Sequence, residues 1–509
     1  MYGFNKLKGD ILNLKWFFLI YFVFLLLFTI YQTKTSHFNL LLTLIPFLIL
    51  FLIGCFIIFI SNRNIPLYKA AFFIILVFGL ISVFLTPIVT VCDETEHFWR
   101  SELTSNGELF PNYVSIPNSN KSSYESKGYL TIASMSPLYK ITGDTFYNSS
   151  WANEKINYSS AYVSSAFCQN PFYGYIPQAV GIGIAKGLNL NNIWMLWLGR
   201  ICNLLMYAII VSYAIKKAPI FKVPLLICSC MALTVYQAAS LSIDSTVNAL
   251  AILSIGYFLY MYKSEDNSLT YKNIGIFLII SLLCGFTKVT YMGLALLVFL
   301  VPKGNFKTEK VRYSRIIGFI SVFCIDLLWT KLFATKQLLN SWRGTYFLKN
   351  NVNAVGQLIF MWHHPLKAFN IIFNLENIWN VICGFFSFGN LPPYTSTFLV
   401  ISFLIFYLAI CFLYPSDIKV NRKFRIGIFL IGFLIFFGTY FVQYLTWCNV
   451  GYPKVVGVFG RYFLPLMALG PMVFNLNNKK ASKNINSLVI CFIICFLSSM
   501  LLLTYINFY

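Results

Sequence analysis

The chain has 509 residues, of which 58% are hydrophobic and only 11% charged, and its formal net charge is +22. This composition excludes a water-soluble globular protein and predicts an integral membrane protein. The positive charge would suggest nucleic-acid binding in a soluble protein, but here the basic residues separate apolar runs, so the expected partner is the lipid bilayer and not a nucleic acid.

Apolar runs recur along the whole chain, and a helix needs about 20 such residues to cross roughly 30 Å of hydrocarbon. The first run, Trp16–Tyr31, follows three lysines as a signal peptide would. No small-residue cleavage site precedes the next run, so we interpret it as a retained span. The sequence predicts about thirteen crossings, near residues 16–32, 39–60, 69–91, 193–214, 221–240, 246–262, 273–286, 288–301, 315–334, 396–414, 426–446, 461–475 and 486–506.

The short basic loops indicate the orientation, because lysine and arginine in such loops face the cytoplasm. They place the N-terminus in the cytoplasm of a multi-pass plasma-membrane protein, with residues 447–460 and two longer segments on the outer face. The predicted organisation is N-terminal transmembrane helices, an extracytoplasmic cap, central transmembrane helices, a second extracytoplasmic segment and C-terminal transmembrane helices, over residues 1–91, 92–192, 193–334, 335–395 and 396–509.

The two long outer segments have different expected structures. The first has roughly 100 residues, too many for a plain connection, which predicts a small folded cap. In the second, Leu366–Phe388 is apolar but interrupted by polar residues, which predicts an amphipathic segment at the membrane interface. Most of the thirteen cysteines fall within apolar runs. Cys92 and Cys168 share the cap, and a disulfide between them stays open.

The densest polar feature follows the third span and comprises Asp93, Glu94, Glu96, His97 and Arg100. In a helix, Asp93 and Glu94 each share a face with His97, so a carboxylate and an imidazole could act on one substrate group. The alternative is a merely polar exit from the membrane. The pattern is not that of the zinc proteases. No cofactor is assigned, and a divalent cation on the carboxylates stays open.

Cations occur at the outer ends of three later spans. Lys288 separates two runs of about 14 residues, each of which reaches only ~21 Å, so the lysine is expected below the membrane surface. A cation there typically lines a cavity for an anionic ligand, and snorkelling to the interface is the alternative. Arg461 and Arg200 repeat the pattern, which suggests a phosphate-binding, acid–base site. Asp244 adds a carboxylate or a helix N-cap.

Six segments together resemble the bacterial membrane-protein family catalogued as domain of unknown function 2142, itself similar to the C-type (GT-C) glycosyltransferases. The resemblance covers nearly the whole chain after residue 80 and rests on Asp93–Arg100, Pro171–Gln178, Leu198–Arg200, Ser240–Ser245, Thr287–Tyr291 and Gly460–Pro465. The chain departs from the family pattern at Cys92, where proline is usual, and at Thr95 and Glu96, where Pro-Ala is usual. Glu96 therefore inherits no family role.

The resemblance implies an all-α, GT-C-like transmembrane bundle of about 13 helices with an extracytoplasmic loop layer. The implied activity is that of a glycosyltransferase, which moves a sugar from a polyprenyl-phosphate donor to an extracytoplasmic acceptor, such as a cell-wall or surface glycan, by inverting displacement. Two other classes stay open. A transporter or flippase of a lipid-linked or anionic solute would use the same cations, and a non-catalytic scaffold in polysaccharide assembly would tolerate loss of Asp93.

Under this implied chemistry, an acceptor hydroxyl needs a base, for which Asp93 is the first choice and Glu94 the second. The departing phosphate gathers negative charge that cations would stabilise. His97 and Arg100 would orient the base or hold the phosphate. The predicted site therefore has three catalytic candidates, Asp93, Glu94 and His97, four donor-phosphate-binding candidates, Lys288, Arg461, Arg200 and Arg100, and the additional candidate Asp244.

Overall fold

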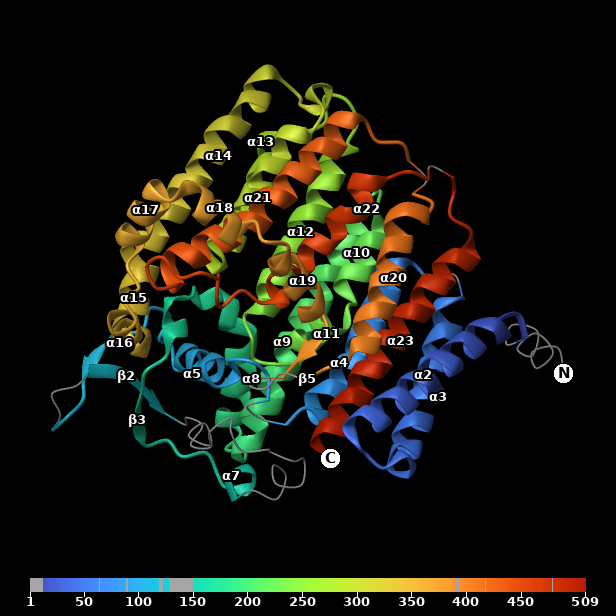
Figure 1. The fold of residues 1–509 in the computed structure, drawn as a ribbon, viewed down its shortest axis with the longest axis horizontal. Helices are drawn as coiled ribbons and strands as arrows, with labels where there is room; N and C mark the ends of the chain where they lie inside the picture. The colour runs from blue at the N-terminus through green and yellow to red at the C-terminus, as the bar shows by residue number, and fades with distance from the viewer. Residues whose placement is uncertain are drawn as a thin grey trace.

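The computed structural model describes residues 12–63, 65–87, 90–118, 122–127, 150–389, 394–416, 418–477 and 479–509. The protein is an all-α polytopic membrane protein, as predicted (Figure 1). Eight of the described helical segments are long and apolar enough to cross a bilayer: α2 (Lys15–Ser36), Leu40–Ser61 (η1 and α3), α4 (Leu67–Leu85), α9 (Asn192–Lys217), α12 (Asp244–Tyr262), Glu309–Asn340 (α14, η7 and α15), α21 (Arg422–Trp447) and α23 (Lys483–Phe508). Shorter apolar helices are α13 (Tyr271–Thr287), η5 (Val289–Leu300) and α20 (Thr397–Leu413).

A helix lies at each of the thirteen predicted spans, but two of these spans are interrupted. The run 221–240 forms two short helices, α10 (Lys222–Ser229) and α11 (Ala232–Ala238). The run 461–475 forms the 3₁₀ helix η8 (Gly460–Ala468), followed by α22 (Leu469–Phe474). Pro465 lies inside η8 and supplies no backbone N–H, so a continuous α-helix is disfavoured there.

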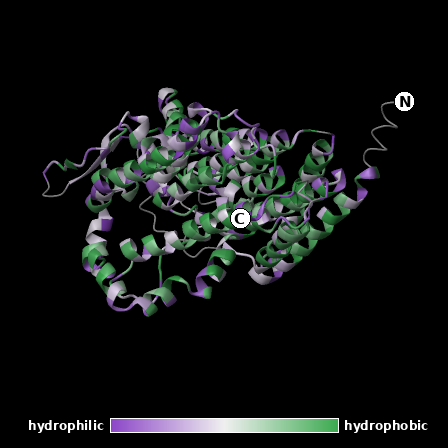
Figure 2. Cartoon of the chain, turned by 90° about the horizontal axis from the view of Figure 1, so that it is seen from above, coloured by the Kyte–Doolittle hydropathy of each residue, from purple (hydrophilic) through white to green (hydrophobic). Residues whose placement is uncertain are grey.

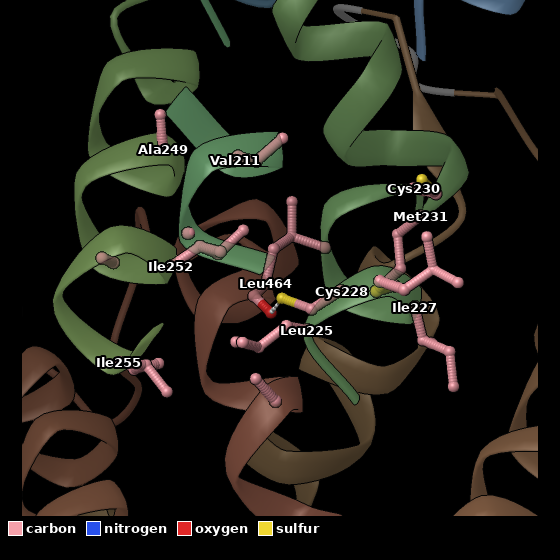
Figure 3. Packing of buried hydrophobic residues seen from close by; sticks show 14 of the residues in the cluster. Val211, Leu225, Ile227, Cys228, Cys230, Met231, Ala249, Ile252, Ile255 and Leu464 are labelled. Carbon is pink, nitrogen blue, oxygen red and sulfur yellow. Dashed lines mark hydrogen bonds between the residues drawn. The ribbon is translucent and has the colours of Figure 1, made fainter. Parts of the chain in front are cut away.

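The interior is built around α12 and α23, whose apolar stretches are 83% and 89% buried. Helix α23 packs against α2, α3 (Leu44–Ser61) and α4, and α12 packs against α9, α13 and η8. Figure 3 shows part of this core, with apolar side chains from α9, α10 and α12 around η8. There the Cys228 thiol donates to the Leu464 carbonyl over 3.0 Å. The core thus fixes the segment that starts with the predicted site residue Arg461.

The cap contains a three-stranded antiparallel sheet in the order β1-β2-β3. Short helices lie around the sheet. Glu102 of α5 links the sheet to α8, because its carboxylate accepts from Ser126 of β2 and pairs with Lys186 of α8. Part of the predicted cap lies outside the described residues. The described elements are α5 (Glu94–Ser105), β1 (Val114–Ser115), β2 (Ser122–Lys127), α7 (Ser150–Asn153), β3 (Ser160–Val163), η3 (Ala166–Gln169), η4 (Phe172–Tyr175) and α8 (Ile176–Gly187).

The second long segment contains no single amphipathic helix over Leu366–Phe388. Helix α18 ends before Asn374, whose side chain caps the next helix by accepting from the Glu376 N–H. Large apolar side chains on these helices are exposed, as in helices that face lipid, and Figure 2 shows hydrophobic residues along most of the helices. The elements are α16 (Trp342–Lys349), α17 (Ala354–His363), α18 (Pro365–Ile372), α19 (Leu375–Gly384), β4 (Ser387–Phe388) and β5 (Tyr394–Thr395).

The sequence interpretation missed one buried carboxylate. Asp326 lies in α14 (Glu309–Trp329), whose apolar stretch is only 11% buried. Its side chain nevertheless faces the protein, where a Cβ built on Gly285 of α13 would lie 2.9 Å from Oδ2. Neither carboxyl oxygen has a hydrogen-bond partner among the described residues. A buried polar group without a partner destabilises a fold.

Replacing this carboxyl should therefore stabilise the protein. Asp326→Leu is expected to raise the free energy of unfolding by about 1–3 kcal/mol, measured as a higher Tm of the purified protein in detergent. Asp266→Leu is the control, because Asp266 is exposed in a loop and such changes usually stay within about 0.5 kcal/mol. A lower Tm for Asp326→Leu would mean that the carboxyl is partnered.

Candidate functional site

Asp93 is the N-cap residue of α5, but its side chain does not cap the helix. Its backbone is left-handed, with φ 62°, a conformation that aspartate adopts more readily than most residues. The carboxylate turns away from α5, and Oδ2 lies 2.8 Å from Nη2 of Arg461. A residue 368 positions later in the chain thus holds the first acid of the motif.

Arg461 joins two carboxylates. Its Nη2 contacts Asp93, and its Nε lies 2.9 Å from Oδ2 of Asp244. The Arg461 side chain is only 10% exposed, against 33% for Asp93 and 13% for Asp244. Asp244 opens α12, but its side chain binds Arg461, so the alternative of an N-cap role does not describe it. Two carboxylates share one guanidinium, so this trio has an excess of negative charge.

Lys288 supplies a second cation next to the trio. It lies between α13 and η5, and its Nζ is 3.0 Å from the centroid of the Tyr462 ring. Asp244 and Arg461 are near enough to act on it electrostatically. Its Nζ makes no hydrogen bond or ion pair with any residue that the structure describes. This half-buried ammonium therefore has donors free for an anion.

A cavity of about 350 Å³ opens beside Asp93 and Arg461. Helix η8, which carries Arg461, packs against α11, α12 and α19, so segments distant in sequence form its walls. The cavity is lined by Cys92, Asp93, Leu233, Gln237, Asn380, Cys383, Gly384, Ser387, Gly389, Thr395, Val458, Phe459, Gly460 and Arg461. Of the two carboxylates that bind Arg461, Asp93 lines this space and Asp244 does not.

His97 lies behind the cavity and positions other groups. Its Nδ1 is 2.8 Å from the Tyr175 hydroxyl, which also accepts from the Asn170 amide. Tyr175 then donates to Nδ1, and this assigns the proton of neutral His97 to Nε2, which faces the Ser242 hydroxyl at 3.4 Å. Burial lowers the pKa of His97 to about 4, so the ring is neutral at pH 7. Ser242 in turn accepts from the Asp244 N–H.

Glu94 and Arg200 form a buried ion pair with no access to the cavity. Nε and Nη2 of Arg200 bind the two carboxylate oxygens over 2.8 and 2.6 Å. Its remaining N–H groups donate to the carbonyls of Val83, Thr86 and Pro87, so all five donors are used. This geometry contradicts the donor-phosphate role predicted for Arg200 and the base role predicted for Glu94. The pair is structural.

Arg100 and Glu96 also hold the cap together. Arg100 is fully buried and donates to the Thr104 hydroxyl and to the Glu108 and Leu109 carbonyls, away from the cavity. The phosphate-binding role predicted for it is therefore corrected to a structural one. Burial raises the pKa of Glu96, which accepts from the Ala166 N–H and from the indole of Trp342.

The described residues contain neither a disulfide between Cys92 and Cys168 nor a cluster of metal ligands. Cys92 and Cys168 are both free thiols. Among the described residues, no three His, Cys, Asp or Glu side chains come together in a way that could hold a metal ion. Sequence reasoning missed two amide side chains in the cavity, Gln237 and Asn380. The available signal for Gln237 was a polar residue within the apolar run 221–240.

The structure thus brings together four of the predicted site residues, Asp93, Asp244, Lys288 and Arg461. No curated protein and no solved structure matches the chain. A family model described as predicted membrane protein (DUF2142) matches residues 76–469, which is well over half of the chain and includes these four residues. The chain therefore belongs to the DUF2142 family of predicted membrane proteins.

Proposed function

We propose that this protein is a membrane glycosyltransferase that moves a sugar from a polyprenyl-phosphate donor to an acceptor outside the cytoplasm. The observation that carries the proposal is the contact of Asp93 with Arg461 at the edge of a cavity, with Lys288 nearby and without an ion pair to any residue that the structure describes. Displacement of a phosphate by a hydroxyl requires a base on one side and cations on the other. The similarity of the DUF2142 family to the GT-C glycosyltransferases favours the same chemistry.

In this mechanism Asp93 is the base, because it is the more exposed carboxylate and lines the cavity. The acceptor hydroxyl gives its proton to Asp93 while its oxygen attacks the anomeric carbon. The bond from that carbon to the phosphate oxygen breaks, and direct displacement inverts the configuration. Lys288 and Arg461 stabilise the charge that collects on the leaving phosphate.

Donor binding would also strengthen the base. Although burial disfavours ionisation, the Arg461 guanidinium holds the pKa of Asp93 below its ordinary value. A donor phosphate shares the Arg461 guanidinium and so weakens its hold on Asp93. The carboxylate then becomes more basic only when a donor is present, which limits unproductive proton transfer in the empty site.

The positions of the basic loops support an extracytoplasmic site. Residues 219–224, Lys263, residues 414–416 and Ile418 line one pocket together with Ala481, so these basic regions gather at one place. By the positive-inside rule this end faces the cytoplasm. Asp93 then faces outward, where the acceptor is a cell-wall or surface glycan.

The test of the proposal uses Lys288→Met in purified protein reconstituted in nanodiscs. Methionine keeps the contact with the Tyr462 ring but removes the charge, and since Lys288 has no ion pair among the described residues, the Tm should change little. Loss of a charged hydrogen bond of about 1.5–3 kcal/mol should weaken binding of a polyprenyl-phosphate sugar by roughly 10- to 150-fold.

The control for this variant is Lys454→Met, because Lys454 is exposed and pairs with Glu376 away from the cavity. Donor affinity should be unchanged in the control. Equal donor affinity in wild type and Lys288→Met would contradict the phosphate role. Flux of an anionic solute across sealed vesicles without any sugar transfer would replace the proposal with a transporter.

A further inference from the structure

Apart from Asp93 and Arg461, the cavity offers uncharged polar groups. Among the described lining residues these are the amides of Gln237 and Asn380 and the hydroxyls of Ser387 and Thr395. Amides and hydroxyls recognise the hydroxyl groups of a neutral sugar. The volume of about 350 Å³ is at the low end of small-molecule sites, which span roughly 300–1,000 Å³. It suits one sugar unit better than an oligosaccharide.

Gln237 is the best-defined recognition group in this wall. It lies in α11, its side chain is 2% exposed, and its Oε1 has no hydrogen-bond partner among the described residues. A buried acceptor without a partner is costly in the empty protein. Oε1 itself lies below the cavity surface, and the part of the Gln237 side chain that lines the cavity offers its amide to a ligand hydroxyl.

Two glycines hold α19, which carries Asn380, against η8, which carries Arg461. A Cβ built on Gly460 would lie 2.5 Å from the backbone carbon of Gly384, so η8 and α19 pack backbone against backbone. This contact fixes Asn380 of α19 relative to Arg461, the residue after Gly460. The polar wall and the phosphate-binding cation therefore keep a constant spacing.

We infer that the transferred group is a sugar without a negative charge, such as a neutral hexose, held in this cavity with one of its hydroxyls hydrogen-bonded to the side-chain amide of Gln237. The inference rests on the proposed function. Among the described lining residues Arg461 is the cation, and it already serves Asp93, Asp244 and the donor phosphate. A sugar carboxylate would have no counter-ion there and would lie beside Asp93, so anionic sugars are rejected.

The experiment measures kcat/KM with polyprenyl-phosphate donors that carry glucose, galactose or mannose, the same hexoses with single hydroxyls removed, and glucuronic acid. Wild type should use a neutral hexose at least about tenfold better than glucuronic acid. Gln237→Leu should lower kcat/KM for that hexose by roughly 10- to 100-fold. Removing one specific hydroxyl should cost wild type a similar factor and Gln237→Leu almost nothing.

Gln178→Leu is the matched control, because Gln178 is also buried with an unpartnered Oε1 but does not line the cavity. It should keep the wild-type response to every removed hydroxyl. Preference for glucuronic acid, or equal hydroxyl sensitivity in wild type and Gln237→Leu, would overturn the inference and leave the transferase proposal standing. No transfer from any donor by folded wild type would overturn both.

Discussion

Asp93→Asn is expected to reduce sugar transfer by about 10²- to 10⁴-fold, the usual contribution of a general base. The fold should survive, because asparagine tolerates the left-handed backbone at φ 62° as well as aspartate does. Its amide oxygen can also still accept from Arg461. The variant therefore removes the proton acceptor and little else. Turnover is measured with purified protein and a polyprenyl-phosphate sugar, with Tm as the check on folding.

Two comparisons separate the base from a general loss of charge. Asp244→Asn removes the other carboxylate of Arg461, but Asp244 does not line the cavity, so its effect on turnover should be smaller. Glu96→Gln changes an acid on the same helix that binds Ala166 and Trp342, and transfer should persist. If Asp244→Asn proved the more damaging variant, the base would be Asp244 and not Asp93.

Much of the fold was predictable because lipid imposes a length and a composition on each span. The same reasoning indicated that Asp93, Lys288 and Arg461 share one end of the helices. The structure places Asp93 and Arg461 on the wall of one cavity, with Lys288 near Arg461 but not lining that cavity. The interruptions at 221–240 and 461–475 were not predicted, since apolar composition looks the same in a continuous helix and in two short ones. Pro465 inside η8 was a local signal for the second of these interruptions.

The roles of adjacent charges could not be read from the sequence. Asp93 and Glu94 are neighbours with the same chemistry, but the left-handed backbone at Asp93 directs its side chain to Arg461 while Glu94 meets Arg200 in the interior. Which acid neutralises which cation depends on burial and on tertiary contacts. The cavity-lining position of Gln237 was harder still to predict, because an uncharged side chain in an apolar run does not by itself indicate a cavity.

Glu94→Gln should lower the free energy of unfolding by about 3–5 kcal/mol, because it leaves the fully buried Arg200 charge without its counter-ion. The pair fixes several elements at once. Arg200 of α9 binds carbonyls at the end of α4, and Glu94 of α5 also accepts from the Leu241 N–H, 3.2 Å away. Loss of the Glu94–Arg200 ion pair should therefore disturb the start of α5, where the backbone of Asp93 is left-handed.

The measurement is the Tm of purified Glu94→Gln in detergent against a surface pair. Glu376→Gln removes the acid from the exposed pair with Lys454, which is worth at most about 1 kcal/mol. Equal, small losses in both variants would show that the Glu94 pair does not carry the fold. A Glu94→Gln protein with wild-type Tm and no transfer would give Glu94 the catalytic role that we propose for its neighbour Asp93.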